Sequence, residues 1–519
     1  MEKSRRVVVR NASGPSAISF ALDACSMDLG LEQISNSRVA VTRLEGRNVA
    51  SGHCVEALQR LFSHIKPGIA AASVLDHWIP TGSRVVIKPN FVTDRNRGPW
   101  GIEPLITSPE LIQAVVEQIM RTEAGEVLVG DAPIQSCDFQ RLLSITGLQE
   151  WSERLQAHDR RFSGIADFRR TTCREIHELR IASENLQPLE NFALFDLGHD
   201  SILEPISDRR RSFRVTCYDP HKMEKTHRPG RHQYLVARKV LEADVVINVA
   251  KLKTHKKAGI TCALKNLVGI NGNKEFLPHH RVGGAAMGGD CYPGLDPVKR
   301  TLEFVLDREN SASSPALATW WHKAGVQLQR VLNLQGDRIG VEGSWFGNDT
   351  VWRMALDLNR ILLYGKADGT MADHVQRRLI HIVDAIVAGQ GDGPLAPQPL
   401  HLGLVLAAEN ATAVDWVGAG LLGYDQKLIP IVSGAFTQFR WPLASFEPSQ
   451  IELVGDLGEG AAALLVRPAQ PVIHPAGWIP ARQQPQSIAA ANVFAAVGHA
   501  NQAETAPART DHPIDIEDA

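Results

Sequence analysis

Polar side chains follow several apolar runs of this sequence. Lys88 and Asn90 come after RVVI, Asp131 ends EVLVGD, and Lys251 and Lys253 follow DVVINVA. In open α/β sheets, ligands bind at the carboxyl ends of the strands. We therefore expect these side chains to meet at one edge of a sheet.

A basic cluster stands at the end of the third run. Lys251, Lys253, Lys256 and Lys257 lie within seven residues. A solvated basic loop explains such a run, because charged stretches usually face water. An anion site explains it as well, since several lysines raise the local concentration of a phosphate or carboxylate ligand.

Lys265 lies in the apolar segment AGITCALKNLVG, next to Asn266. A lysine in apolar surroundings loses its charge readily, and this is how enzymes obtain amine nucleophiles and bases. The alternative is a packed aliphatic stem with its ammonium group in water. On the first interpretation Lys265 and His255 are the central reactive groups, with Asp131 and Asp384 orienting or assisting them.

Three histidines lie near Lys265 in the sequence, namely His255, His279 and His280. They are candidate ligands for a divalent transition metal, or an acid and a base, although their spacing fits no closed zinc motif. The seven cysteines contain no C-x-x-C pair, so no iron–sulfur cluster is encoded.

A polar and aromatic block, SWFGNDTVWRMALDLN, contains Arg353 and Asp357. Asn348 or Asp349 can cap a helix that places these two residues one turn apart, where an ion pair is worth a few tenths of a kcal/mol. Arg353 beside tryptophans is also a candidate for holding a ligand anion.

Six short apolar runs have the composition of strands buried on both faces of a parallel sheet: 84–92, 126–132, 244–252, 381–387, 402–408 and 451–455. Helical patterns at 108–121 and 412–422 alternate with them; Ser108 and Pro109 form a start signal for the first. This alternation predicts an α/β fold with a mostly parallel, doubly wound sheet, helical insertions, and one lobe or two.

The predicted organisation has six parts. They are an N-terminal region (1–83), an α/β core (84–148 and 236–295), an insertion or cap (149–235), a mostly helical subdomain (296–378), a C-terminal part of the α/β core (379–482), and a disordered tail (483–519).

Composition narrows the setting. The chain has 519 residues, 44% of them hydrophobic, and a formal net charge of −2. This balance gives no reason to expect nucleic acid as a partner, and no run is long and apolar enough for a membrane helix. The scattered cysteines favour the reducing cytoplasm.

Several of these segments resemble the domain of unknown function 362 family. The similarity rests on VVIKPNFV, TSPELIQAVVEQI, VLVGDA, IHIVDAIVAGQGDGP, TAVDWVGAGLLG and, most specifically, KLKTH followed by ALKNL. The block around Arg353 resembles a long subset of that family. Many members carry a ferredoxin-type cysteine cluster, which this chain lacks.

A more distant similarity links the run from His255 to Lys265 to nickel-pincer lactate racemase. It implies that Lys265 would tether the pincer cofactor and that His279 or His280 would bind nickel. Ala263 and Leu264 replace the glycine pair that precedes the lysine in that family, and its Asp-Gly-Thr-Arg-Pro motif is absent.

The sequence thus favours an enzyme that acts on a small anionic metabolite by proton transfer or a metal-assisted step. The alternative is a non-catalytic binding protein for a phosphorylated or metal-bound ligand. Turnover distinguishes the two.

Overall fold

A nine-stranded sheet forms the centre of the computed structural model, which describes residues 31–44, 50–68, 74–176, 179–215, 218–456 and 471–478. Eight strands follow one another across the sheet and β12 (Gly259–Thr261) pairs with β11. Their order is β16 (Glu452–Gly455), β1 (Arg38–Arg43), β15 (Ala396–Ala408), β14 (Arg378–Asp392), β11 (Val245–His255), β2 (Arg84–Pro89), β3 (Glu126–Asp131) and β4 (Phe162–Asp167).

The sheet is mixed and mostly parallel. All its strands run in one direction except β12 and β15, which pair antiparallel with their neighbours. The predicted α/β class and mostly parallel sheet are therefore confirmed. β15 follows β14 after a short turn, which reverses the direction of the chain and makes the two strands antiparallel. A parallel pair would need a much longer crossover connection.

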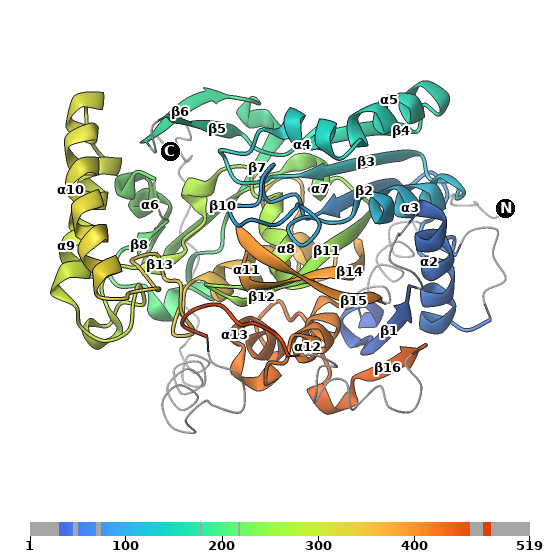
Figure 1. Ribbon diagram of the computed structural model, residues 1–519. Coiled ribbons are helices and arrows are strands. Elements are labelled where there is room, and N and C mark those ends of the chain that lie inside the picture. Colours follow the sequence, from blue (N-terminus) through green and yellow to red (C-terminus); the bar gives the residue numbers. More distant parts are fainter. Residues whose placement is uncertain are drawn as a thin grey trace, which may run out of the picture.

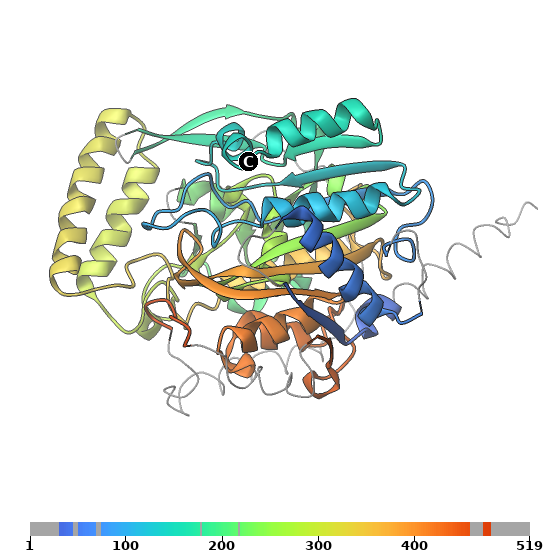
Figure 2. The ribbon, with the colours of Figure 1, turned by 45° about the vertical axis from the view of Figure 1, so that its right-hand side comes forward.

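Both faces of the sheet are buried, which explains why its strands are continuous runs of Val, Ile and Leu. Val85 and Ile87 of β2 pack into one core and Val86 into the other. The first face is covered by α2 (Ser51–Ile65), α3 (Pro109–Met120), α4 (Phe139–Ile145) and α5 (Leu148–His158). The second is covered by α8 (Ala263–Asn266), α11 (Val351–Tyr364), α12 (Ala411–Leu421) and α13 (Pro430–Ser433) (Figures 1 and 2).

Side-chain caps begin two helices, and the cap at Ser108 is the one that the sequence predicted. Ser108 caps α3 by accepting from the Leu111 amide at 3.4 Å, with Pro109 in the first turn. The α12 helix begins after Asn410, whose side chain accepts from the Thr412 and Ala413 amides. These caps satisfy amide groups that the helix itself leaves unpaired.

The chain between β4 and β11 forms smaller units. They are the β5–β6 hairpin (Thr171–Ile176, Leu179–Asn185), a sheet of β7 (Phe192–Asp196), β10 (Arg231–Ala237) and β9 (His227–Arg228), strand β8 (Phe213–Arg214) paired with β13 (His280–Arg281), and the helices α6 (Pro220–Thr226) and α7 (Arg238–Leu241).

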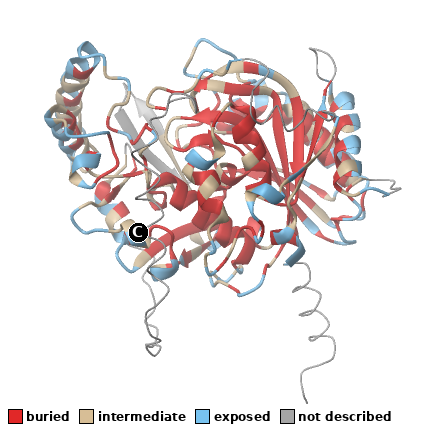
Figure 3. Ribbon diagram, turned by 90° about the horizontal axis from the view of Figure 1, so that it is seen from below, coloured by how far each residue is buried: buried red, intermediate tan, exposed pale blue. Residues whose placement is uncertain are grey.

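Helices α9 (Pro297–Asn310) and α10 (Pro315–Leu334) form a hairpin beside the sheet (Figure 1). It has a small core of its own, built from Cys291, Tyr292, Leu302, Leu332 and Val341. Its outward side is exposed, while the strands and α11 are buried (Figure 3).

Two further predictions concern the C-terminal tail and the absence of a membrane helix. The tail predicted beyond residue 483 lies outside the described residues. Within the described part of the chain, no helix has the length and apolar character that crossing a membrane requires.

Candidate functional site

A cavity of about 810 Å³ lies at the carboxyl ends of β2, β3 and β11. Parallel strands end at one edge, so the polar residues that close each strand meet there. The cavity brings together nine residues singled out in the sequence: Asn90, Asp131, Lys253, His255, Lys256, Lys257, Lys265, Asn266 and His279.

Lys253 enters this edge from the end of β11. That strand extends three residues beyond its predicted end at Leu252, because β12 folds back and pairs with it. The Lys253 ammonium donates to the Asn90 side chain at 2.8 Å and to the Leu105 carbonyl. Both partners are neutral. Burial and the neighbouring lysines hold the pKa of Lys253 well below its ordinary value.

Lys88 lies beneath the cavity and forms a buried ion pair with Asp131, with 2.6 Å between ammonium and carboxylate. The second oxygen of Asp131 accepts from the Phe91 amide at 2.7 Å. Gly269 permits this pair, since a Cβ there would lie 2.1 Å from the Asp131 carboxylate. Lys88 is therefore compensated by charge, whereas Lys253 is not.

Amide side chains connect these groups. Asn266 accepts from Asn90 at 2.8 Å and from Lys88 at 3.3 Å, and donates to Asn248 at 2.7 Å. A fully satisfied buried network of this kind fixes its members in place. Asn90 and Asn266 thus hold the lysines in position.

Lys265 projects from the short helix α8. The buried Asp415 accepts from the Leu264 amide, and Asn359 donates to the Leu264 carbonyl at 2.8 Å, so two covering helices fix α8. No described residue pairs with the Lys265 ammonium. Burial and the charges of Lys274, Lys257 and Lys88 lower the pKa of Lys265 to about 7.

His255 is neutral and has a defined proton. Its Nδ1 accepts from the Lys257 and Ala258 amides at 3.0 and 3.1 Å. An amide only donates, so Nδ1 carries no proton and the neutral ring holds it on Nε2. Burial and nearby lysines keep the pKa of His255 well below its ordinary value. The residue therefore offers a hydrogen-bond donor.

His279 has the opposite tautomer. Its Nδ1 is 2.7 Å from the Leu277 carbonyl, which only accepts, so Nδ1 carries the proton and Nε2 has a free lone pair. Burial and adjacent lysines keep its pKa well below the ordinary value as well. His255 and His279 thus give the cavity one imidazole donor and one imidazole acceptor.

His280 does not join this pair and does not line the cavity. Its ring lies with Cys291 and Glu303. The proton on Nε2 of His255 also leaves that ring without a free lone pair. The structure therefore does not assemble His255, His279 and His280 as one set of metal ligands.

Lys251 and Asp384 lie away from the cavity as a buried ion pair between β11 and β14, 2.9 Å apart. Asp384 also accepts from the Ser108 amide at 2.7 Å. A β-bulge between Lys251 and Lys253 shifts the register at this point. Lys251 is held by an acid, while Lys253 reaches the cavity.

Arg353 is buried in α11, outside the cavity lining, and its guanidinium bonds to Asp349 and to the Ile202 carbonyl. The pair expected between Arg353 and Asp357 does not form. Asp357 instead pairs with Arg360 at 2.9 Å, because Asp349 precedes Arg353 by one turn. Asn348 accepts from the first amides of α11, as its position predicted.

The structure adds cavity residues that sequence reasoning did not select. Lys274 donates to the Ala132 carbonyl at 3.3 Å, and burial lowers its pKa to about 8. The α9–α10 hairpin supplies a wall that includes Glu309, His322 and Gln329. Lys274 follows the turn NGN, which was a weak signal, but nothing in the helical pattern indicated which hairpin face meets the sheet.

Comparison with known proteins gives one family match and one distant relative. The family described as "Domain of unknown function (DUF362)" matches residues 85–187 and 203–420. The "Thylakoid-associated protein sll1697" of Synechocystis is 21% identical over 398 residues, which are 76% of this chain and 78% of that protein.

Among solved structures, a protein from Thermotoga maritima aligns with 69% of this chain at 11% identity and a TM-score of 0.28. The alignment spans 55% of that protein. A likeness this weak supports no conclusion about fold or function.

Proposed function

Because this chain belongs to the DUF362 family, whose description names no activity, we propose a function from the site itself. We propose that the protein is an enzyme that binds a small anionic metabolite in the cavity and moves a proton on it. The observation that carries the proposal is Lys265, a cavity amine without an ionic partner among the described residues and with a pKa of about 7.

The charge around the cavity favours an anionic ligand. Within the part of the chain that the structure describes, Lys253 and Lys265 have no carboxylate partner, and Lys274 bonds only to a carbonyl. Buried cations without counter-ions are costly, and a bound carboxylate or phosphate offsets that cost. The volume of about 810 Å³ suits a metabolite-sized ligand.

Lys265 is the best base in the cavity. Its pKa of about 7 leaves part of its amines unprotonated at neutral pH, while His255 and His279 are too weakly basic. In the proposed step a C–H bond beside a carbonyl or carboxylate breaks and Lys265 takes the proton. The electron pair moves onto the oxygen, where the Nε2–H of His255 stabilises it. Lys253 holds the anionic end of the ligand.

The pincer cofactor implied by the racemase similarity fits only in part. The free amine of Lys265 suits a covalent tether, but of His255, His279 and His280 only His279 presents an imidazole lone pair to the cavity. One imidazole makes a poor nickel site. We therefore assign the proton step to the chain's own residues, without a metal in this cavity.

The test has two stages. Inorganic phosphate is titrated first, by calorimetry, into wild type, Lys265→Met and the exposed control Lys427→Met. The proteins are then incubated in D₂O with 2-hydroxy, 2-oxo and phosphorylated carboxylic acids, and loss of C–H signals is followed by proton NMR. We expect phosphate binding and isotope exchange in wild type and Lys427→Met only.

Tight binding without exchange of any acid would favour the non-catalytic binding protein instead. Equal phosphate binding by Lys265→Met and wild type would remove Lys265 from the site. We also propose a cytoplasmic location, from the cysteine pattern; the Synechocystis relative's name associates that protein with thylakoids.

A further inference from the structure

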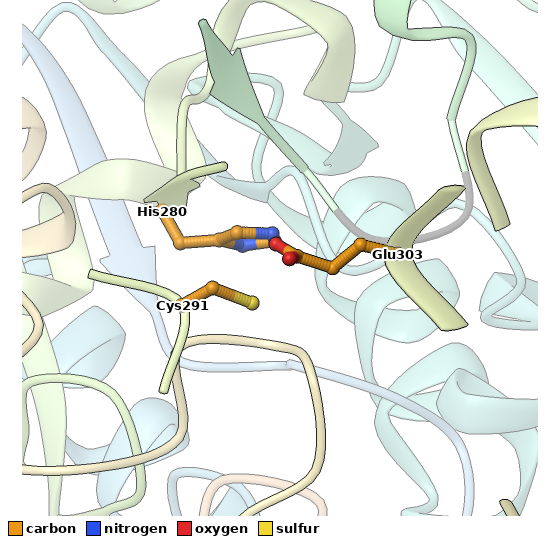
Figure 4. A group of neighbouring side chains, drawn as sticks. All are labelled: His280, Cys291 and Glu303. Atoms are coloured by element: carbon orange, nitrogen blue, oxygen red, sulfur yellow. The ribbon is translucent and has the colours of Figure 1, made fainter. Parts of the chain in front are cut away.

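A second group of side chains capable of binding a metal lies beside the α9–α10 hairpin, outside the cavity. It consists of His280 from β13, Cys291 from the following loop and Glu303 from α9. One ligating atom of each lies within 4.8 Å of the other two. Figure 4 shows the imidazole and the carboxylate meeting while the Cys291 sulfur points into the same space.

These groups are buried, and the imidazole is incompletely satisfied. Their exposed fractions are 4% for His280, 0% for Cys291 and 9% for Glu303. The Nδ1 atom of His280 is buried and has no hydrogen-bond partner among the described residues. An unsatisfied buried nitrogen costs about 1–3 kcal/mol in general, so it calls for a partner.

The surrounding backbone holds the three groups in place. The Gly283 amide donates to one oxygen of Glu303 at 2.9 Å, and the Tyr292 hydroxyl donates to the other at 3.1 Å. The Cys291 amide bonds to the Gly283 carbonyl at 3.1 Å, which closes the glycine-rich loop. Gly284 permits the closure, because a Cβ there would lie 2.2 Å from the Gly294 carbonyl oxygen.

We propose that His280, Cys291 and Glu303 bind a Zn²⁺ ion. Imidazole, thiolate and carboxylate are the ligands that zinc takes in proteins, with bonds of about 2.0–2.3 Å. Tetrahedral zinc places such atoms less than about 4 Å apart, so a small inward movement of the side chains completes the site. A water or the second Glu303 oxygen takes the fourth position.

Proton balance gives the binding a signature. A cysteine thiol is mostly protonated at neutral pH. Zinc binds the thiolate, so the S–H bond breaks, a Zn–S bond forms and one proton leaves for each ion bound.

The ion would join three segments that are close in space but up to 23 positions apart in the chain (280 to 303). It would fasten α9 to β13, next to the wall of the cavity. The site is thus a structural anchor for the hairpin, and it goes beyond the proposed function.

Co²⁺ added alone to the chelator-treated full-length chain tests the proposal. We expect one ion per chain, a thiolate-to-cobalt charge-transfer band in the near ultraviolet, release of a proton and a higher Tm. Cys291→Ala should lose the band, and Cys54→Ala, which removes another buried thiol, should keep it. Glu303→Gln, which keeps the side-chain shape, should bind Co²⁺ at least tenfold more weakly.

Two results would overturn the site. One is a wild-type chain that takes up no Co²⁺ or Zn²⁺ after chelator treatment. The other is a charge-transfer band that survives in Cys291→Ala. Because the wild type alone gives the first answer, the test holds even if a variant fails to fold.

Discussion

Two lysines of one strand, Lys251 and Lys253, have opposite surroundings. Lys251 pairs with a carboxylate, whereas Lys253 bonds only to neutral oxygens and faces the cavity. A buried charge without a counter-ion in its own protein marks a candidate site for a ligand of opposite charge. The same reasoning distinguishes Lys88, paired with Asp131, from Lys265, which has no such partner.

Lys265→Met should stabilise the protein near neutral pH. The lysine has a pKa of about 7 in the folded chain against 10.5 when unperturbed, so folding opposes its protonation. Below pH 7 the full penalty applies; between pH 7 and 10.5 the unfolded chain binds more protons, and wild-type stability rises with pH. The variant should gain roughly 1–3 kcal/mol at pH 6–7 and lose this advantage by pH 10.

Urea unfolding of both proteins across this pH range checks the prediction. A variant less stable than wild type at pH 7 would mean that the ammonium anchors the fold. In that case its loss of phosphate binding could not be assigned to the site.

Gly269→Ala should destabilise the protein by about 2–4 kcal/mol. The new Cβ would stand 2.1 Å from the Asp131 carboxylate and 2.7 Å from the Lys88 ammonium, so the buried pair must separate. Gly52→Ala is the matched control, since no atom lies within 4 Å of its Cβ. Thermal melts should show a large loss for the first and none for the second; equal melts would mean that the pair tolerates displacement.

Among the secondary-structure elements, the Lys251–Asp384 ion pair joins β11 to β14. Asp384 also accepts a hydrogen bond from the amide of Ser108, the residue that caps α3. Lys251→Met should lower the free energy of unfolding by about 3–5 kcal/mol, because it leaves Asp384 buried and charged. Adding Asp384→Asn should recover part of the lost free energy of unfolding, since it removes the unpaired charge of the Asp384 carboxylate.

Lys256→Met provides a control from the same cluster. Lys256 is 3.9 Å from Asp392 at a partly exposed position, where ion pairs are worth under about 1 kcal/mol. Chemical denaturation of the three variants measures the difference. Similar losses for Lys251→Met and Lys256→Met would contradict the assignment of the buried pair as structural.

The strands show how much of the fold could be predicted from the sequence. All six predicted apolar runs are strands of the main sheet. Burial on both faces explains the continuous apolar signature of the inner strands, whereas β16 is exposed or half-buried along its length. Strand β1 was missed, since its pairing with β15 depends on residues more than 350 positions away. The sequence placed Lys251 and Lys253 together; the bulge that separates them belongs to the register with β14.

The tautomers of His255 and His279 could not be predicted from the sequence either. They depend on a turn that directs two amides at one ring and a carbonyl at the other. The apolar segment around Lys265 left two settings open, a buried amine or a packed stem with its ammonium group in water, and the structure places Lys265 at a half-buried position in the cavity lining.

At the scale of the whole molecule, the sheet and the hairpin differ in how they are supported. The strands lie between two large cores, while α9 and α10 pack around a small one of five buried residues. Regions with little buried apolar contact open locally at a low free energy. The hairpin also supplies one wall of the cavity, so we expect its local opening to expose Lys265.

Hydrogen exchange should therefore separate the two regions. We expect the amides of α9 and α10 to exchange at least tenfold faster than those of β11, which is buried along its whole length. Saturating inorganic phosphate should slow exchange in the hairpin and leave β11 unchanged, because a ligand that fills the cavity binds the closed state more tightly than the open one. Exchange at equal rates in both regions would mean that the hairpin opens only with global unfolding. If phosphate bound without slowing the hairpin, the wall would not close on the ligand and the cavity would be an open surface site.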